Sequence, residues 1–360
     1  MAAVMKKIFK ILLGSAAALM LIVGIYAAYV FLSYDRLDDC LNLEVKGSTG
    51  KTAGTEKEYK ILTYNIVFGA YEQDYSFFMD GGKESRAFSP ERLESNMKNI
   101  GDFLEGCSAD FYLIQETDEN ATRTYHFNER EYLTSRMSEY VSVWAQNWDS
   151  AYLFYPVTKP HGKTVSGILT FSEYDINEAV RRSLPVETGA VKIADLDRCY
   201  SVSRIAVDNG RELVLYNVHL SAYTSDGSIA VDQIEMLTED MKSEYEKGNY
   251  VVCGGDFNKD LLGNSSEVFG VSGEDYTWDQ PFPFEILSGT GLSLVTPDAE
   301  SDPVPSTRIT DKPYHEGQYV VLIDGFIVSD NVEVILTGVV NQEFAYSDHN
   351  PVTMVFKLKE

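Results

Sequence analysis

Basic side chains are scarce in this sequence. It has 30 Lys and Arg against 55 Asp and Glu, which gives a formal net charge of −25. Such a chain repels the phosphates of nucleic acids and of anionic bilayers, so non-specific electrostatic binding to either is disfavoured. A phosphorylated substrate is still compatible, because bound divalent cations can reverse the charge at a site.

Cysteine is also rare. The four cysteines (Cys40, Cys107, Cys199 and Cys253) contain no Cys-x-x-Cys spacing and are too few for a disulfide scaffold. We therefore predict no metal role for them. Internal repeats are absent, and no Pro/Gly-rich linker divides the region after residue 58, so we expect one folded domain.

Charged residues are missing from Ile11 to Tyr34, between three lysines in residues 1–10 and an acidic stretch that begins at Asp35. A helix of about 20 residues crosses a bilayer, and the basic flank stays in the cytoplasm. We predict a cytoplasmic segment over 1–10, a single transmembrane anchor over 11–34, and an extracytoplasmic remainder on the cell membrane.

A cleaved signal peptide is the alternative reading of the N-terminus. Against it, the apolar stretch exceeds the roughly 7–15 residues of a signal core, and the bulky run Tyr29–Tyr34 offers no small-residue cleavage site. We interpret the polar segment 35–58 as a juxtamembrane tether and 59–360 as the catalytic domain.

Strand-like apolar runs recur after residue 58. They cover 59–66, 111–115, 138–144, 151–155, 167–171, 201–207, 212–219, 250–254, 320–328 and 352–358. Helical periodicity follows the N-cap signal Ser89-Pro90-Glu91 and recurs over about 229–246. Many strands with a few intervening helices predict an α+β fold with helices outside mixed or packed sheets.

The apolar run that begins at Tyr250 ends in Gly254 and Gly255 and is followed by Asp256 and Asn258. Alternation in an extended segment points these two polar side chains the same way. Their oxygen and nitrogen atoms suit water, a hard cation and phosphate oxygens, although the same residue types are common in tight turns.

Other apolar runs contain or end in polar residues. These residues are Asn65, Glu116, Asn217, His219, Asp324, Asp348 and His349. Each one alone is typical of a structural residue, but together they indicate metal-assisted attack of water on a phosphoester. A buried Asp324 would orient a histidine, and Glu116 would bind Mg²⁺ or Mn²⁺.

The order of six short motifs is similar to that of the endonuclease/exonuclease/phosphatase superfamily, the DNase I-like group of nucleases, sphingomyelinases and inositol-polyphosphate phosphatases. The motifs are Thr63-Tyr64-Asn65, Gln115-Glu116, Val218-His219-Leu220, Gly255-Asp256-Phe257-Asn258, Ile323-Asp324 and Ser347-Asp348-His349. The resemblance, which is to a membrane-anchored bacterial-type member, implies a four-layer αββα sandwich over residues 59–360, and this domain follows the transmembrane helix predicted above.

The resemblance also implies roles for individual residues. Glu116 would be the main metal ligand, near Asn65 and Asp348. His349, paired with Asp324, and Asp256 would act on water and phosphate, with the identity of the base left open between His349 and Asp256. The remaining implied contacts to phosphate oxygens come from Asn258, His219 and, as a family arginine, Arg204.

Two departures from the family bear on the substrate. Pro305-Ser306-Thr307-Arg308 stands where inositol phosphatases have Trp-x-Asp-Arg, which argues against that branch. Extra segments at 69–89 and 154–163 either shape a substrate pocket or form surface loops. We expect a membrane-tethered Mg²⁺- or Mn²⁺-dependent phosphoesterase acting on a lipid head group, small phosphodiester or nucleic acid.

Two alternatives to that expectation are a nuclease rather than a lipid or small-molecule phosphodiesterase, and an anchored binding module with a retired site. The bilayer would be contacted through the N-terminal helix, and no motif indicates a protein partner.

Overall fold

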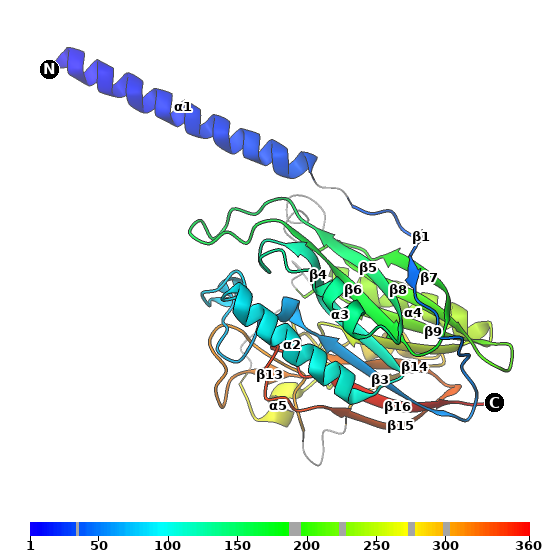
Figure 1. Cartoon of the computed structure of the whole chain (residues 1–360). Helices are drawn as coiled ribbons and strands as arrows, with labels where there is room; N and C mark the ends of the chain where they lie inside the picture. Colours follow the sequence, from blue (N-terminus) through cyan, green and yellow to red (C-terminus); the bar gives the residue numbers. More distant parts are fainter. Residues whose placement is uncertain (34–35, 187–195, 223–227, 273–277, 298–302) are drawn as a thin grey trace.

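The computed structural model describes residues 1–33, 36–186, 196–222, 228–272, 278–297 and 303–360. Its first element, α1 (Ala2–Leu32), is one continuous helix that projects from the rest of the molecule (Figure 1). Residues 3–32 of this helix are long and apolar enough to cross a membrane, a property shared by signal sequences.

Two seven-stranded sheets form the body of the molecule. Sheet A has the order β1 (Leu41–Asn42), β7 (Ile176–Ser183), β8 (Cys199–Ala206), β9 (Glu212–His219), β10 (Tyr250–Asp256), β14 (Asp324–Ser329) and β11 (Leu292–Val295). Sheet B has the order β15 (Val332–Val339), β16 (Val352–Leu358), β3 (Glu58–Asn65), β4 (Phe111–Ala121), β6 (Thr164–Ser172), β5 (Val141–Asp149) and β2 (Val45–Lys46). A short pair, β12 (Thr307–Arg308) and β13 (Val320–Val321), lies beside them.

Alternation along the strands explains why the sheets pack face to face. Ile61 and Leu113 of sheet B meet Leu215 and Val252 of sheet A in one buried cluster. The intervening side chains point to the opposite faces. The central strands of each sheet are therefore buried on both faces, one against the partner sheet and one against helices.

Helices cover the outer faces. The helices α2 (Pro90–Cys107) and α3 (Glu129–Arg136) pack on sheet B, and α4 (Ser228–Glu246) packs on sheet A. A fourth helix, α5 (Ser265–Phe269), lies against β13. The four layers confirm the predicted αββα sandwich (Figure 1).

Two parallel strand pairs interrupt the otherwise antiparallel sheets. Strands β3 and β4 are joined through α2, and β9 and β10 through α4. Parallel neighbours bring their carboxyl ends to the same sheet edge. Asn65, His219 and Asp256 are the last residues of β3, β9 and β10, so the connection through each helix brings these strand ends together in space.

Three predicted elements differ in the structure. Residues 151–155, predicted as a strand, form a loop, and the predicted strand 320–328 divides into β13 and β14. The predicted tether 35–58 contains β1 and β2, which pair with β7 and β5. Over its described part, this segment is therefore bound to the edges of both sheets.

Candidate active site

Three predicted residues meet where strands of the parallel pairs end. Asn65 ends β3 and His219 ends β9, while Asp256 ends β10 directly opposite His219. The Asn65 Nδ2 atom donates a hydrogen bond of 3.0 Å to Asp256 Oδ2. This contact joins sheet B to sheet A, so the site depends on the packing of the two sheets.

Glu116 reaches the same place through a β-bulge. The pairing of β4 with β6 shifts between Ile114 and Thr117, and Glu116 adopts a left-handed backbone with φ of 56°. A bulge redirects a side chain out of the regular ladder. As a result, Glu116 Oε1 lies 3.4 Å from Asn65 Nδ2 and 4.0 Å from His219 Nε2.

Asp256 is buried and held on both oxygens. Its Oδ1 atom accepts from the Asn258 backbone N–H at 2.9 Å, and Asn258 Nδ2 donates to the Leu220 carbonyl at 2.9 Å. Burial, followed by the nearby charge of Asp324, raises the pKa of Asp256 to about 7. A carboxyl group with this pKa can exchange a proton near neutral pH.

His349 is paired with Asp324. The histidine Nδ1 atom lies 2.8 Å from Asp324 Oδ2, while Nε2 faces Asp256 Oδ2 at 3.8 Å. Burial lowers the pKa of His349, but the charge and hydrogen bond of Asp324 outweigh it and raise that pKa to about 10. The imidazole is therefore positively charged in this environment, held in one orientation by Asp324.

His219 behaves in the opposite way. Burial, with smaller contributions from Arg198 and His349, lowers the pKa of His219 well below its usual range. Its Nε2 atom lies 3.6 Å from Asp256 Oδ2. The two histidines therefore face one carboxylate in different charge states, His219 neutral and His349 cationic.

The donor chemistry of the site fits a hard divalent cation. Glu116, Asp256 and Asp348 provide carboxylate oxygens beside the Asn65 amide, and such oxygens are the ligands of Mg²⁺. Among the described residues, Asp348 Oδ1 is buried without a hydrogen-bond partner. Burial raises the pKa of Asp348 to about 7, which a bound cation would reverse.

A second grouping could also offer metal ligands. Asp256, Asp324 and His349 each have a ligand atom within 4.8 Å of the others. The hydrogen bond between Asp324 and His349 already engages one atom of each residue. We therefore assign these two to a charged pair and expect the cation nearer Glu116.

A cavity of about 500 Å³ opens over these residues. Its walls include seven of the predicted site residues, namely Asn65, Glu116, His219, Asp256, Asn258, Asp348 and His349, while Asp324 lies behind His349. Both extra segments of the sequence contribute to the walls, through Phe77 to Asp80 and through Phe154, Tyr155 and His161. They shape the pocket.

Arg204 is not brought to the cavity. Its guanidinium lies on the outer side of sheet A, where it binds Glu244 at 2.7 Å and Glu212 at 2.8 Å. Both carboxylates come from neighbouring elements, β9 and α4, that fix the arginine on this face. The structure therefore corrects its expected place beside substrate.

The arginines that line the cavity are Arg123, Arg198 and Arg308, and sequence reasoning missed them as site residues. Arg123 makes hydrogen bonds of 2.9 and 2.8 Å to Asp118, stacks 3.8 Å over the ring of Phe68, and lies 3.8 Å from Glu116 Oε2. Arg308 donates to the backbone carbonyls of Ile309 and Glu72. No spacing in the sequence marks these contacts.

Comparisons with known proteins bear on this arrangement. Residues 62–349 match the model of the Endonuclease/Exonuclease/phosphatase family. Comparison with curated proteins by sequence gives no match. Among solved structures, the chain is similar to an endonuclease/exonuclease/phosphatase from Beutenbergia cavernae, with 16% identity, a TM-score of 0.57, and 84% of this chain and 72% of that one covered.

Two further solved structures share the fold. One is ANGEL2, a 2′,3′-cyclic phosphatase, in complex with adenosine-2′,3′-vanadate, with 15% identity, a TM-score of 0.56, and 89% and 99% of the two chains covered. The other is the human Nocturnin catalytic domain with a bound sulfate anion, with 16% identity, a TM-score of 0.54, and 88% and 98% covered. At these identities the likeness shows the fold alone.

Proposed function

The chain belongs to the endonuclease/exonuclease/phosphatase family, and from this membership and the geometry of the cavity we propose that it is a divalent-metal-dependent hydrolase of phosphoester bonds, tethered to a membrane by α1. The observation that carries the proposal is the meeting of the two sheet edges. Asp256 of sheet A contacts Asn65 of sheet B while His349 faces the same carboxylate.

Glu116, with Asn65 and Asp348, would hold Mg²⁺ or Mn²⁺, which when bound supplies Lewis-acid polarisation of a phosphate oxygen. The residues of the chain supply the rest. Asp256 is oriented by Asn65 and by the Asn258 backbone, which leaves it placed to accept a proton from water. The cationic His349 lies across from it and stabilises negative charge on phosphate.

This division of roles favours Asp256 over His349 as the base. His349 already donates from Nδ1 to Asp324, and its Nε2–H is a donor in the charged form. A donor suits phosphate oxygens or the leaving alcohol better than it suits an attacking water. Neutral His219 and Asn258 complete the polar end of the cavity beside the phosphate.

The test uses the full chain in detergent micelles and bis(p-nitrophenyl) phosphate. We expect hydrolysis that requires Mg²⁺ or Mn²⁺, stops with chelator, and falls at least about 10²-fold in His349→Ala. Wild type no faster than His349→Ala on phosphodiesters and phosphomonoesters alike would support the alternative of an anchored binding module.

Two finer points need their own measurements. Hydrolysis of single- or double-stranded DNA faster than of small diesters would favour a nuclease.

The proposed topology places residues 1–10 in the cytoplasm and the sandwich outside. A mature N-terminus at or beyond residue 30 would instead identify a secreted protein, because the anchor would have been removed.

A further inference from the structure

The end of α1 touches the loop that borders the cavity. Tyr26 donates its hydroxyl hydrogen to the Tyr152 carbonyl at 2.9 Å, and the Tyr152 backbone N–H donates to the Tyr29 hydroxyl at 3.1 Å. The rings of Tyr26 and Phe154 meet edge to face with centroids 5.1 Å apart. Both backbone polar groups of one loop residue are therefore bonded to the helix.

The position of these contacts along α1 gives the level of the loop relative to a bilayer. About 20 helical residues cross the hydrocarbon core. Counted from Lys10, the last charged residue of α1, that length ends near Val30. Tyr26 and Tyr29 thus lie in the last turns of the span, where aromatic residues occupy the membrane interface. A loop bonded to them lies at the same level.

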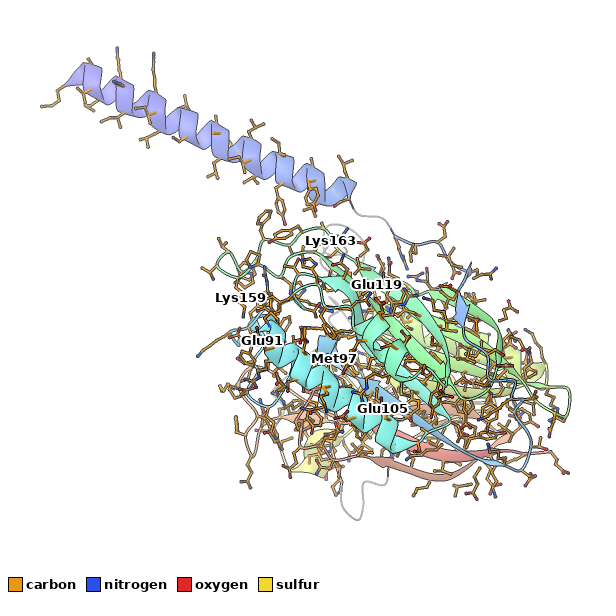
Figure 2. The ribbon with its side chains drawn as sticks, viewed as in Figure 1. Glu91, Met97, Glu105, Glu119, Lys159 and Lys163 are labelled. Atoms are coloured by element: carbon orange, nitrogen blue, oxygen red, sulfur yellow. The ribbon has the colours of Figure 1, made fainter. Side chains whose placement is uncertain are left out.

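The same loop exposes large apolar side chains. Outside α1, the described residues include seven exposed large hydrophobic side chains, and four of them lie on two loops beside the cavity. They are Met79, Phe154, Tyr155 and Val157, with Val157 84% exposed. Lys163, at the end of this segment, lies beneath the end of α1 in Figure 2. Grouped apolar exposure of this kind marks an interaction surface.

Aromatic rings connect this surface to the polar end of the cavity. Tyr155 packs on Phe78 with centroids 5.5 Å apart, and Phe78 on Phe77 at 4.9 Å. The series continues through Tyr71 to Phe68, which carries the guanidinium of Arg123 beside Glu116. One wall of the cavity is thus apolar from the bilayer level down to the proposed metal ligand.

We propose that residues 152–157 sit in the interface of the membrane that α1 spans, and that the cavity receives a phospholipid from this membrane. The phosphate would lie between Glu116 and His349, with the glycerol region along the wall from Phe77 to Tyr155. The net charge of −25 disfavours attraction to anionic surfaces, so apolar contact brings the loop and the lipid together.

The chemical step rests on the proposed function. Water adds across one P–O bond of the phosphodiester: its oxygen bonds to phosphorus, the P–O bond to one alcohol breaks, and a proton passes to the leaving alkoxide. The products are a phosphomonoester and an alcohol, so no oxidant or co-reactant is needed. Placement of the loop in the interface does not depend on this chemistry and is tested separately.

The first test measures depth. The full chain, with Cys40 and Cys107 changed to serine because they are the two cysteines that are not buried, is reconstituted in phosphatidylcholine vesicles. A fluorophore on Val157→Cys should be quenched by nitroxide-labelled lipids. The matched control is Leu336→Cys, 65% exposed on β15 at the far side of the domain (Figure 1). Equal quenching at both positions, or none at 157, would overturn the proposal.

The second test measures lipid turnover. Vesicles of phosphatidylcholine, phosphatidylethanolamine and phosphatidylglycerol are assayed for released products by mass spectrometry, with soluble bis(p-nitrophenyl) phosphate in parallel. Val157→Asp should hydrolyse vesicle lipid roughly tenfold more slowly, because it puts a charge where the proposal places an exposed apolar side chain in the membrane interface. The same variant should hydrolyse the soluble diester at the wild-type rate, since Val157 does not line the cavity.

The two failures are distinguishable. If the wild type hydrolyses the soluble diester but no vesicle lipid, or if Val157→Asp matches wild type on vesicles, the lipid proposal is wrong and the proposed function stands. If the wild type does not hydrolyse the soluble diester or any other phosphoester, the proposed function fails. In that case the quenching experiment still decides where the loop lies.

Discussion

Asp324 accepts a hydrogen bond of 2.8 Å from His349, although one residue begins β14 and the other lies 25 positions later, before β16. The carboxylate is buried behind the imidazole, and the opposite ring nitrogen faces Asp256. Asp324 thus fixes both the direction and the charge of His349.

Replacing Asp324 by Asn should lower kcat on a soluble phosphodiester by about 10²-fold or more. The asparagine keeps the size of the side chain but removes the charge that raises the pKa of His349 to about 10. The alkaline limb of the kcat/KM profile should therefore move to lower pH. Asp232→Asn, which changes an exposed carboxylate on α4, is the control and should leave the profile unchanged.

The pH dependence of the reaction should also report on Asp256. Burial raises the pKa of this group to about 7, so its ionised, proton-accepting form grows as the pH rises through that value. A cation bound beside a carboxylate lowers its pKa. The acidic limb of kcat/KM should therefore move to lower pH as Mg²⁺ is raised toward saturation. A limb that stays in place across the Mg²⁺ titration would remove Asp256 from this role.

Arg123→Gln should destabilise the fold by about 3–5 kcal/mol, because it leaves the carboxylate of Asp118 buried without its charge partner. That side chain has no exposed surface, and Arg123 holds both of its oxygens. Chemical unfolding of the full chain measures the loss. Lys163→Gln removes an exposed pair with Asp149 at 3.1 Å and should change stability by less than about 1 kcal/mol.

Arg204→Gln should weaken the fold without changing kcat/KM, since its guanidinium binds Glu244 and Glu212 away from the cavity. Burial raises the pKa of Glu244, but hydrogen bonds from Arg204, Lys247 and Asn249 outweigh it and lower that pKa to about 2. A lowered pKa stabilises the fold above the unfolded value of 4.5, and this contribution disappears as the pH falls to about 2. The difference in unfolding free energy between wild type and variant should therefore shrink over that range. A loss of kcat/KM at unchanged stability would return Arg204 to the site.

The sequence predicts the regular elements well where local signals agree with packing. The helix α2 begins as its N-cap residue indicates, because the side chain of Ser89 accepts a hydrogen bond from the Arg92 backbone. The strands β3 and β9 have alternating side chains that satisfy a sheet core on one face and helices on the other. In these segments the local pattern and the tertiary environment select the same structure.

The predictions of secondary structure fail in segments whose conformation is set by contacts with distant parts of the chain. Residues 151–155 have the composition of a strand, yet Tyr152 bonds to α1 and Phe154 packs on Tyr26, and the segment makes only an isolated antiparallel bridge between Leu153 and Gly162. The two-residue strands β1 and β2 are too short to show any periodicity.

The residues of the candidate site also fall into those that the sequence predicts and those that it does not. Residues at strand ends could be found from the sequence because the strands themselves are evident. Arg123 could not, since its partners are Asp118 on the bulged strand β4 and Phe68 in the turn after β3, whose paths no local pattern gives. Arg204 was expected to contact phosphate, but an arginine in a strand gives no sign of which face of the sheet it occupies.

The strands β1 and β2 have a mechanical consequence. They lie three residues apart on the segment that follows α1, and they form edge strands of different sheets. If α1 is an anchor as proposed, tension on it would load the pairing of β1 with β7 and of β2 with β5, together with the contacts of α1 to Tyr152. In sheet A, strands β7 and β8 lie between the edge strand β1 and the strands β9 and β10. His219 and Asp256 therefore do not lie on the strands that take this load directly.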